Sequence, residues 1–135
     1  MTGTPTSATA SVEAVRRFYE AAGDRAVIDQ AMSPDVVWDI TPGFLRGGIY
    51  EGLDAVLDFL RANAQEFVQL AARPEKFFAD GAGHVTVLGH YAVEAEDDRS
   101  APVRFHHLWT LADGRIVRLD QSADSLVLDR LHRRE

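Results

Sequence analysis

The feature that most constrains this chain is a hairpin pattern between residues 105 and 117. Asp113-Gly114 is a dipeptide that favours the tight turn of a β-hairpin, and apolar residues alternate on the strand before it. Because strand side chains alternate, one face carries Phe105, His107, Trp109 and Leu111. A single imidazole between aromatic walls is typical of a small-molecule pocket. The pattern therefore predicts a strand pair with a pocket against one face.

The first half of the chain is predicted to be mainly helical. Apolar residues recur at helical spacing after Ser11, after Asp24 and after Gly52, and Ser11 and Asp24 are suitable N-caps. Residues 36–40 predict a short strand, and residues 41–51 predict a loop because they hold several glycines.

The second half is predicted to be mainly strands. Residues 67–78 predict a strand with a bend at Arg73-Pro74, residues 84–95 predict another, and residues 116–123 follow the hairpin turn. Asp124 is expected to cap a short final helix. Helices followed by a run of strands indicate an α+β fold, with the helices packed on one curved antiparallel sheet.

Composition and charge narrow the classes of function. The absence of cysteine excludes disulfides, thiolate metal sites and cysteine nucleophiles. A net charge of -7 argues against a nucleic-acid partner, and no apolar run is long enough to cross a bilayer. Residues 1–10 lack the basic start and apolar core of a secretory signal. We expect a flexible tail over 1–10 and a cytoplasmic protein.

Several segments, taken together and in order, resemble the nuclear transport factor 2-like superfamily, in particular its SnoaL-like and ketosteroid-isomerase-like branch. The segments are Val15-Arg16-Arg17-Phe18-Tyr19-Glu20-Ala21, Ser33-Pro34-Asp35-Val36-Val37-Trp38, Tyr50-Glu51-Gly52-Leu53-Asp54-Ala55-Val56, and His107-Leu108-Trp109 followed by Asp113-Gly114-Arg115-Ile116 and Asp124. The resemblance covers residues 11–131 and implies a single SnoaL-like domain over 11–135. It also implies a cone-shaped, curved antiparallel sheet that is packed against N-terminal helices and surrounds a hydrophobic cavity.

His107 is the leading candidate for a catalytic group. It falls near the position where the isomerase-like relatives hold an acid that stabilises an oxyanion. An imidazole can donate a hydrogen bond to an oxyanion or relay a proton near neutral pH. The alternative is a buried histidine whose hydrogen bonds are satisfied by a neighbour. His106 should point to the opposite face of the strand.

Asp39 is the candidate general base. Steroid isomerases of the family carry an aspartate just before a Pro-x-Gly-like break, and residues 39–43 are Asp-Ile-Thr-Pro-Gly. Counting from Asp35 instead gives Ile40 that position, with Trp38 facing inward. A slip of one residue moves every side chain to the other face, so the choice between Asp39 and Ile40 stays open. A solvated carboxylate on the outer face is the alternative for Asp39.

Ligand-binding roles are expected for Tyr19, Trp38, Tyr91, Phe105, Trp109 and Gln121. The isomerase branch has a hydrogen-bonding tyrosine in its first helix, where Phe18 is the better match, so Tyr19 would have to supply the hydroxyl. Gln121 occupies a place on the last strand where cyclases and epoxide hydrolases of the family hold a carboxylate. An amide can orient a carbonyl or a water but cannot take its proton. For the aromatic residues, core packing is the alternative.

Two functions remain open because this fold hosts many activities. One is a cofactor-free enzyme of isomerase, cyclase or hydratase type, which acts by acid/base chemistry on a small, hydrophobic, carbonyl-bearing molecule. The other is a non-catalytic ligand-binding protein or dimeric interaction module. No metal site is expected, because no histidine pair has helical i, i+4 spacing beside a carboxylate. A homodimer is expected through the outer face of the sheet, with no nucleic-acid or membrane partner.

Overall fold

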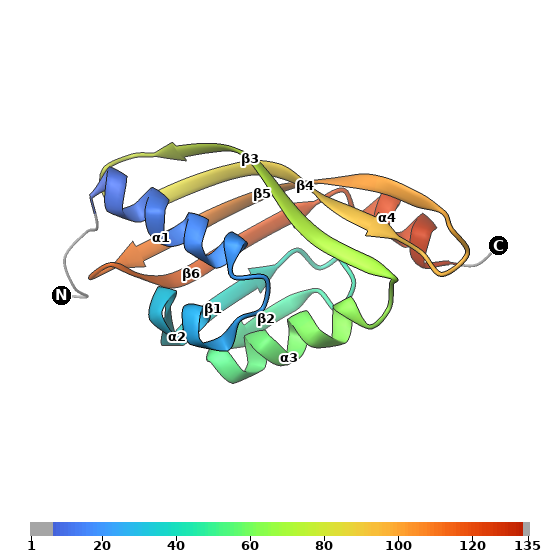
Figure 1. Ribbon diagram of the computed structural model, residues 1–135, viewed down its shortest axis with the longest axis horizontal. Helices are drawn as coiled ribbons and strands as arrows, with labels where there is room; N and C mark the ends of the chain where they lie inside the picture. Colours follow the sequence, from blue (N-terminus) through green and yellow to red (C-terminus); the bar gives the residue numbers. More distant parts are fainter. Residues whose placement is uncertain (1–6, 134–135) are drawn as a thin grey trace.

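The computed structural model describes residues 7–133, in which four helices and six strands are present (Figure 1). In chain order they are α1 (Ala8–Glu20), α2 (Arg25–Ala31), β1 (Met32–Ile40), β2 (Gly48–Glu51), α3 (Leu53–Ala64), β3 (Gln69–Ala79), β4 (His84–Glu94), β5 (Ser100–Ala112), β6 (Arg115–Ala123) and α4 (Ser125–His132).

The strands form one curved sheet in the order β2-β1-β6-β5-β4-β3. The long strands β3, β4, β5 and β6 pair antiparallel with one another in that order, and β2 pairs antiparallel with β1. β1 pairs parallel with β6, with Trp38 opposite Leu119 and Ile40 opposite Gln121. In Figure 1, α1 crosses the curved sheet and α3 lies along the lower side, whereas α4 lies at the far end near the β4–β5 hairpin. The predicted α+β class and curved sheet are confirmed, with one parallel pairing added.

The β5–β6 hairpin forms where the sequence predicts it. Asp113 and Gly114 have φ values of 53° and 81°, as the primed two-residue turns that match strand twist require. Thr110 pairs with Arg118 and Ala112 with Arg115. In this register the side chains of β5 and β6 alternate between the two faces of the sheet as predicted, and His107 points toward the helices.

Three boundaries differ from the sequence prediction. α1 begins at Ala8 rather than after Ser11, because Ser7 is the N-cap and its hydroxyl accepts from the Ala10 amide at 3.3 Å. Residues 7–10 of the expected tail therefore belong to the helix and its cap, while residues 1–6 lie outside the described part. The expected loop 41–51 contains β2, which pairs with β1. β1 itself starts early, and an irregularity between Met32 and Val37 takes Pro34 out of the ladder.

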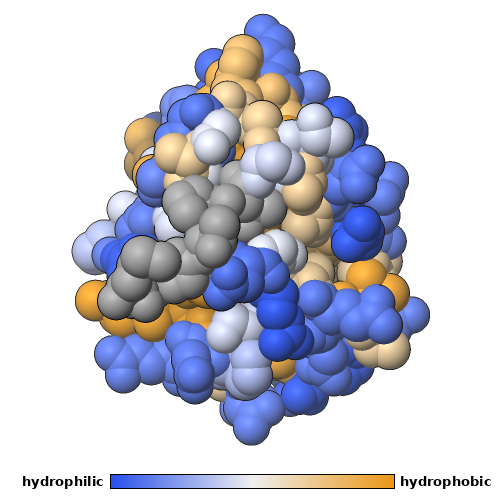
Figure 2. Space-filling view, turned by 90° about the vertical axis from the view of Figure 1, so that its left-hand side faces the viewer, coloured by the Kyte–Doolittle hydropathy of each residue, from blue (hydrophilic) through white to orange (hydrophobic). Residues whose placement is uncertain are grey.

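The core lies between the concave face of the sheet and the helices. Fully buried side chains come from every layer: Val15 from α1, Val56 from α3, and Val85, Trp109 and Ile116 from the sheet. On the face seen in Figure 2, apolar residues form a band between hydrophilic flanks. No helix among residues 7–133 is both long and apolar enough to span a membrane.

Candidate functional site

A pocket of about 570 Å³ opens between the concave face of the sheet and helices α1 and α3, and we call it the central pocket. Its volume lies in the range of about 300–1,000 Å³ that small-molecule sites occupy. Aromatic rings supply much of the wall: Phe18, Tyr19, Trp38, Phe44, Phe59, Tyr91 and Trp109. His107 and Gln121 also line it. Of the catalytic and ligand-binding residues predicted from the sequence, all except Asp39 and Phe105 therefore line this one pocket.

Strand alternation positions His107 and Gln121. They are directly opposite each other on β5 and β6, and they are only 4% and 6% exposed. Phe105, two residues before His107, does not line the pocket. Its ring stacks instead on the imidazole, with 3.8 Å between the ring centroids. Phe105 thus supports His107 from behind rather than facing a ligand.

A glycine makes room for that stack. Gly89 on β4 lies opposite Phe105, and a Cβ there would be 2.9 Å from the Phe105 ring and 2.3 Å from the Arg73 carbonyl oxygen. No other residue type fits without moving the backbone of β3. The position of the His107 ring therefore depends on the absence of a side chain at Gly89.

His107 is the centre of a hydrogen-bond network. The Tyr19 hydroxyl is 2.5 Å from Nδ1 of His107, and the Tyr91 hydroxyl is 2.7 Å from Nε2. Trp109 donates its indole N–H to the Tyr19 oxygen, and Gln121 donates its amide N–H to the Tyr91 oxygen, each at 3.0 Å. The four partners come from α1, β4, β5 and β6 and hold the imidazole between two hydroxyls.

Burial keeps this network uncharged near neutral pH. It lowers the pKa of His107 from 6.5 to about 3, with a smaller contribution from the charge of neighbouring His106. Burial raises the pKa of Tyr19 and of Tyr91, because a phenolate would be poorly solvated there. Both phenols and the imidazole are therefore neutral.

One of the two tyrosine hydroxyls beside His107 has a hydrogen that is free to donate. A neutral imidazole has one N–H and one lone pair, so it donates to one tyrosine and accepts from the other. The tyrosine that accepts from His107 retains its own hydroxyl hydrogen, and no other hydrogen bond in the described chain uses it. The network thus presents one O–H donor for a ligand, from Tyr91 or from Tyr19 according to the tautomer.

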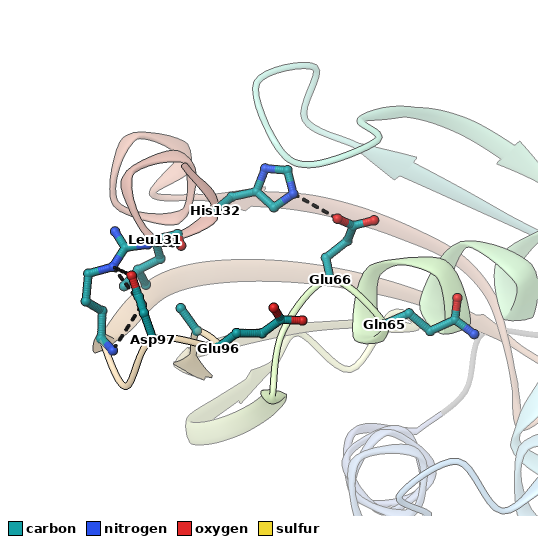
Figure 3. A pocket seen from close by; sticks show the side chains of 8 residues that line it. Gln65, Glu66, Glu96, Asp97, Leu131 and His132 are labelled. Atoms are coloured by element: carbon teal, nitrogen blue, oxygen red, sulfur yellow. Dashed lines mark hydrogen bonds and ion pairs between the residues drawn. The ribbon is translucent and has the colours of Figure 1, made fainter. Parts of the chain in front are cut away.

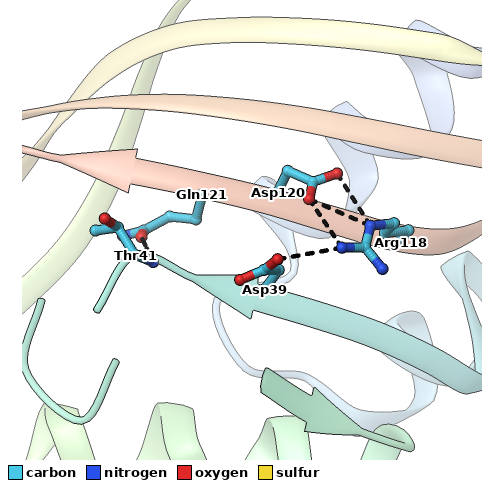
Figure 4. A network of polar contacts seen from close by, with 5 residues as sticks. All are labelled: Asp39, Thr41, Arg118, Asp120 and Gln121. Atoms are coloured by element: carbon cyan, nitrogen blue, oxygen red, sulfur yellow. Dashed lines mark hydrogen bonds and ion pairs between the residues drawn. The ribbon is translucent and has the colours of Figure 1, made fainter. Parts of the chain in front are cut away.

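Asp39 lies away from the central pocket. Its carboxylate accepts from Arg118 at 3.2 Å, and Arg118 also binds Asp120, so that both aspartates turn toward one guanidinium (Figure 4). Ile40 is the residue that faces inward, at 1% exposure. The parallel register with β6 fixes this choice, because Ile40 is opposite Gln121. The candidate base is therefore a half-exposed ion-pair partner on the outer face, and this placement removes it from the pocket chemistry.

The structure adds lining residues that the sequence did not single out. Phe44 comes from the β1–β2 loop, and Phe59 belongs to α3, where its spacing from Val56 was an available signal. Arg61 and Arg73 also border the pocket, and no aspartate or glutamate of residues 7–133 does so. Phe44 from the β1–β2 loop and Arg73 from β3 could not be predicted as lining residues, because their distance from the pocket depends on the tertiary fold and not on a local sequence pattern.

A second, smaller hollow of about 280 Å³ lies between the β4–β5 hairpin, the end of α3 and α4 (Figure 3). Two polar contacts line it: His132 Nε2 is hydrogen-bonded to the Glu66 carboxylate at 2.9 Å, and Arg99 forms an ion pair with Asp97 at 2.7 Å. These partners help to hold the pKa of Glu66 and of Asp97 below their usual values. None of the site residues expected from the sequence lies here.

Comparison with known proteins identifies the family. The model of the SnoaL-like domain matches residues 15–119, so this chain belongs to the SnoaL-like family of the nuclear transport factor 2-like superfamily. No match is found among the curated proteins.

Solved structures support the same assignment. An NTF2-like protein of unknown function from Burkholderia pseudomallei is 30% identical, with a TM-score of 0.82 over 93% of this chain and 98% of that one. TerC, co-crystallised with polyporic acid, is 26% identical, with a TM-score of 0.82 over 91% and 98% of the two chains. A protein assigned as a SnoaL-like polyketide cyclase, from Jannaschia, is 22% identical, with a TM-score of 0.77 over 91% of each chain, and shows the shared fold alone.

Proposed function

We propose that this protein binds a small, hydrophobic, carbonyl-bearing molecule in the central pocket and acts on it without a cofactor, by stabilising the negative charge that develops on its carbonyl oxygen. The observation that carries the proposal is the unused hydroxyl hydrogen of the Tyr19–His107–Tyr91 network beside an aromatic pocket of about 570 Å³. A donor of this kind binds a carbonyl oxygen. TerC, which has the same fold, was co-crystallised with polyporic acid, and this supports a ligand-binding role for the fold.

The network favours stabilisation of negative charge over release of a proton. A hydrogen bond from a fixed hydroxyl strengthens as a carbonyl oxygen becomes more negative, and it is stronger in a pocket without water. The raised pKa of Tyr19 and of Tyr91 opposes full transfer of the phenolic proton. We therefore assign the donor tyrosine the role of oxyanion stabiliser and His107 the role of holding it in place.

A second candidate, binding without catalysis, is favoured by a different observation. No carboxylate among the described residues lines the pocket, so proton abstraction would rely on His107. That imidazole is a weak base with a pKa of about 3, and both of its nitrogens already have partners. In this alternative the network serves only to recognise a ligand oxygen.

A panel of hydrophobic ketones, enones and diones would distinguish an enzyme from a protein that only binds its ligand. Compounds that raise the melting temperature are incubated with the protein and then analysed by mass spectrometry. For an enzyme, the double variant Tyr19→Phe/Tyr91→Phe should reduce turnover by roughly 10²–10³, as the loss of one oxyanion donor does elsewhere.

Asp39→Asn is the matched control, because its side chain lies on the outer face and its loss should leave turnover unchanged. Ligands that bind but return unchanged from the wild-type protein would establish the binding alternative. A panel in which no compound shifts the melting temperature would contradict both.

A further inference from the structure

The loop between β1 and β2 is longer than the pairing of these strands requires. Ile40 pairs with Gly48, so the seven residues 41–47 connect two strands that are directly paired. Two to five residues are enough for most hairpin connections. The longer loop carries Phe44, which is 6% exposed and lines the central pocket. The extra residues thus add one aromatic ring to the pocket wall.

This loop contacts the hydrogen-bond network of the pocket in two ways. The Phe44 ring lies against the Tyr91 ring, with 5.6 Å between the centroids. At the start of the loop, the Thr41 backbone N–H donates to Oε1 of Gln121 at 3.3 Å (Figure 4), and the Gln121 amide donates in turn to the Tyr91 oxygen at 3.0 Å. The position of the loop therefore limits the space beside the Tyr91 hydroxyl.

Side-chain contacts with α3 and the residues after it hold the loop in place. Arg46 donates to Oδ1 of Asn63 at 3.1 Å and to the Glu66 carboxylate at 2.9 Å. Asn63 donates its own amide N–H to the Leu45 carbonyl oxygen at 3.0 Å. Asn63 is 2% exposed, so both ends of a buried amide are bound to this one loop. Buried polar groups need such partners, which fixes the loop against α3.

The backbone of the loop would not favour this shape by itself. Arg46 has a φ of 58°, in the left-handed region that disfavours residues other than glycine. Gly47 lies so close to the start of the loop that a Cβ there would be 2.2 Å from the Thr41 carbonyl oxygen. Sparsely populated conformations persist where surrounding contacts hold them. The contacts of Arg46 and Asn63 therefore determine where Phe44 lies.

We propose that residues 41–47 are the specificity loop of the central pocket, in which Phe44 limits the size of the ring system that fits beside Tyr91. Arg46 is a positioning residue that acts through Phe44. This inference rests on the proposed function, because the ligand oxygen is bound by the tyrosine of the His107 network. Loss of the Phe44 ring extends the pocket beside Tyr91, so a carbonyl compound with an added ring gains affinity relative to one without it.

Two ketones that differ by one ring test the proposal. 1-Tetralone has two fused rings and 9-fluorenone has three, and each carries one carbonyl oxygen. Calorimetric titration gives the two dissociation constants and their ratio. In Phe44→Ala, we expect this ratio to change roughly tenfold in favour of 9-fluorenone, because 1-tetralone loses a contact and the third ring occupies the vacated space. Phe44→Leu should act in the same direction by a smaller factor, and it decides the question if Phe44→Ala does not fold.

The positioning role of Arg46 is tested in the same titrations. Arg46→Met retains the apolar stem and removes the hydrogen bonds to Asn63 and Glu66, so we expect the ratio to change in the direction of the Phe44 variants. Arg17→Met is the matched control, because it removes a guanidinium that pairs with Glu13 on the exposed side of α1, at 3.7 Å. The control should leave both dissociation constants unchanged.

Three results would overturn the inference. One is a ratio that keeps its wild-type value in Phe44→Leu, with both probes weakened equally, which would indicate a loop that serves packing alone. Another is a ratio that changes in the Phe44 variants and not in Arg46→Met, which would remove the positioning role. A third is the same change of ratio in Arg17→Met. Failure of both probes to bind the wild-type protein would count instead against the proposed function on which the inference depends.

Discussion

The buried imidazole makes a specific prediction about stability and pH. His107 is neutral in the folded protein because burial lowers its pKa from 6.5 to about 3, whereas in the unfolded chain it titrates normally. Between these two values the unfolded chain binds more protons than the folded protein. The contribution of His107 to the free energy of unfolding is therefore greatest above pH 6.5 and decreases as the pH falls toward 3.

The size of the effect follows from the two pKa values. Between pH 7.5 and pH 5.0, a histidine with a pKa of 6.5 when unfolded and about 3 when folded removes about 2 kcal/mol from the free energy of unfolding. Other groups titrate over this interval too, so the total change is not diagnostic. The change attributable to His107 is the difference between the wild-type protein and a variant that lacks the imidazole.

His107→Gln is the appropriate variant, because an amide can still donate and accept toward the two tyrosines but does not titrate. Urea unfolding at pH 7.5 and pH 5.0 can be followed by the fluorescence of Trp38 and Trp109, which are both buried. We expect the wild-type protein to lose about 2 kcal/mol more than His107→Gln between the two pH values. Equal losses, within a few tenths of a kcal/mol, would refute the claim that His107 is held neutral by burial.

Two further predictions concern packing and assembly. Gly89→Ala should lower the free energy of unfolding by about 1–3 kcal/mol in urea titrations, because the added Cβ would overlap the Arg73 carbonyl. Gly43→Ala is the control and should lower it less, since the nearest atom to its added Cβ is the side-chain oxygen of Ser125 at 3.3 Å. Similar effects of the two changes would contradict this reasoning. We also predict a homodimer through the outer face of the sheet, where Leu108 is 39% exposed. Light scattering should give a mass of about twice 14.9 kDa for the wild-type protein and about one chain mass for Leu108→Asp. A wild-type mass of one chain would count against the dimer.

The sequence predicted best those features that depend on local alternation. Strand alternation and the position of the turn placed His107 and Trp109 on one face, and the family resemblance singled out Gln121; in the structure all three line the central pocket. The role of Tyr19 was left open, because helical spacing does not determine whether Phe18 or Tyr19 contacts a strand residue 88 positions later in the sequence. The structure settles that point, since the hydroxyl of Tyr19 contacts the imidazole.

Other features depend on contacts that local patterns do not encode. The choice between Asp39 and Ile40 followed from the parallel register of β1 on β6, and an expected all-antiparallel sheet contained no such constraint. The sequence did not predict β2, because a strand of only four residues in a glycine-rich segment shows little periodicity. The sequence could not predict that the buried indole nitrogen of Trp38 has no hydrogen-bond partner within residues 7–133, because the pairing of a donor depends on its surroundings.

The parallel pairing of β1 with β6 also bears on how the protein folds. It joins segments about 80 residues apart, as the contact of Thr41 with Gln121 shows, and closing so long a loop is slow compared with forming the β4–β5 and β5–β6 hairpins. Trp38 enters on β1, and Tyr19 comes from the helix before it, so the pocket is complete only after this late pairing. Ligand affinity should consequently track the population of the fully paired sheet, and a mutation far from the pocket that weakens the β1–β6 pairing would reduce binding without touching a lining residue.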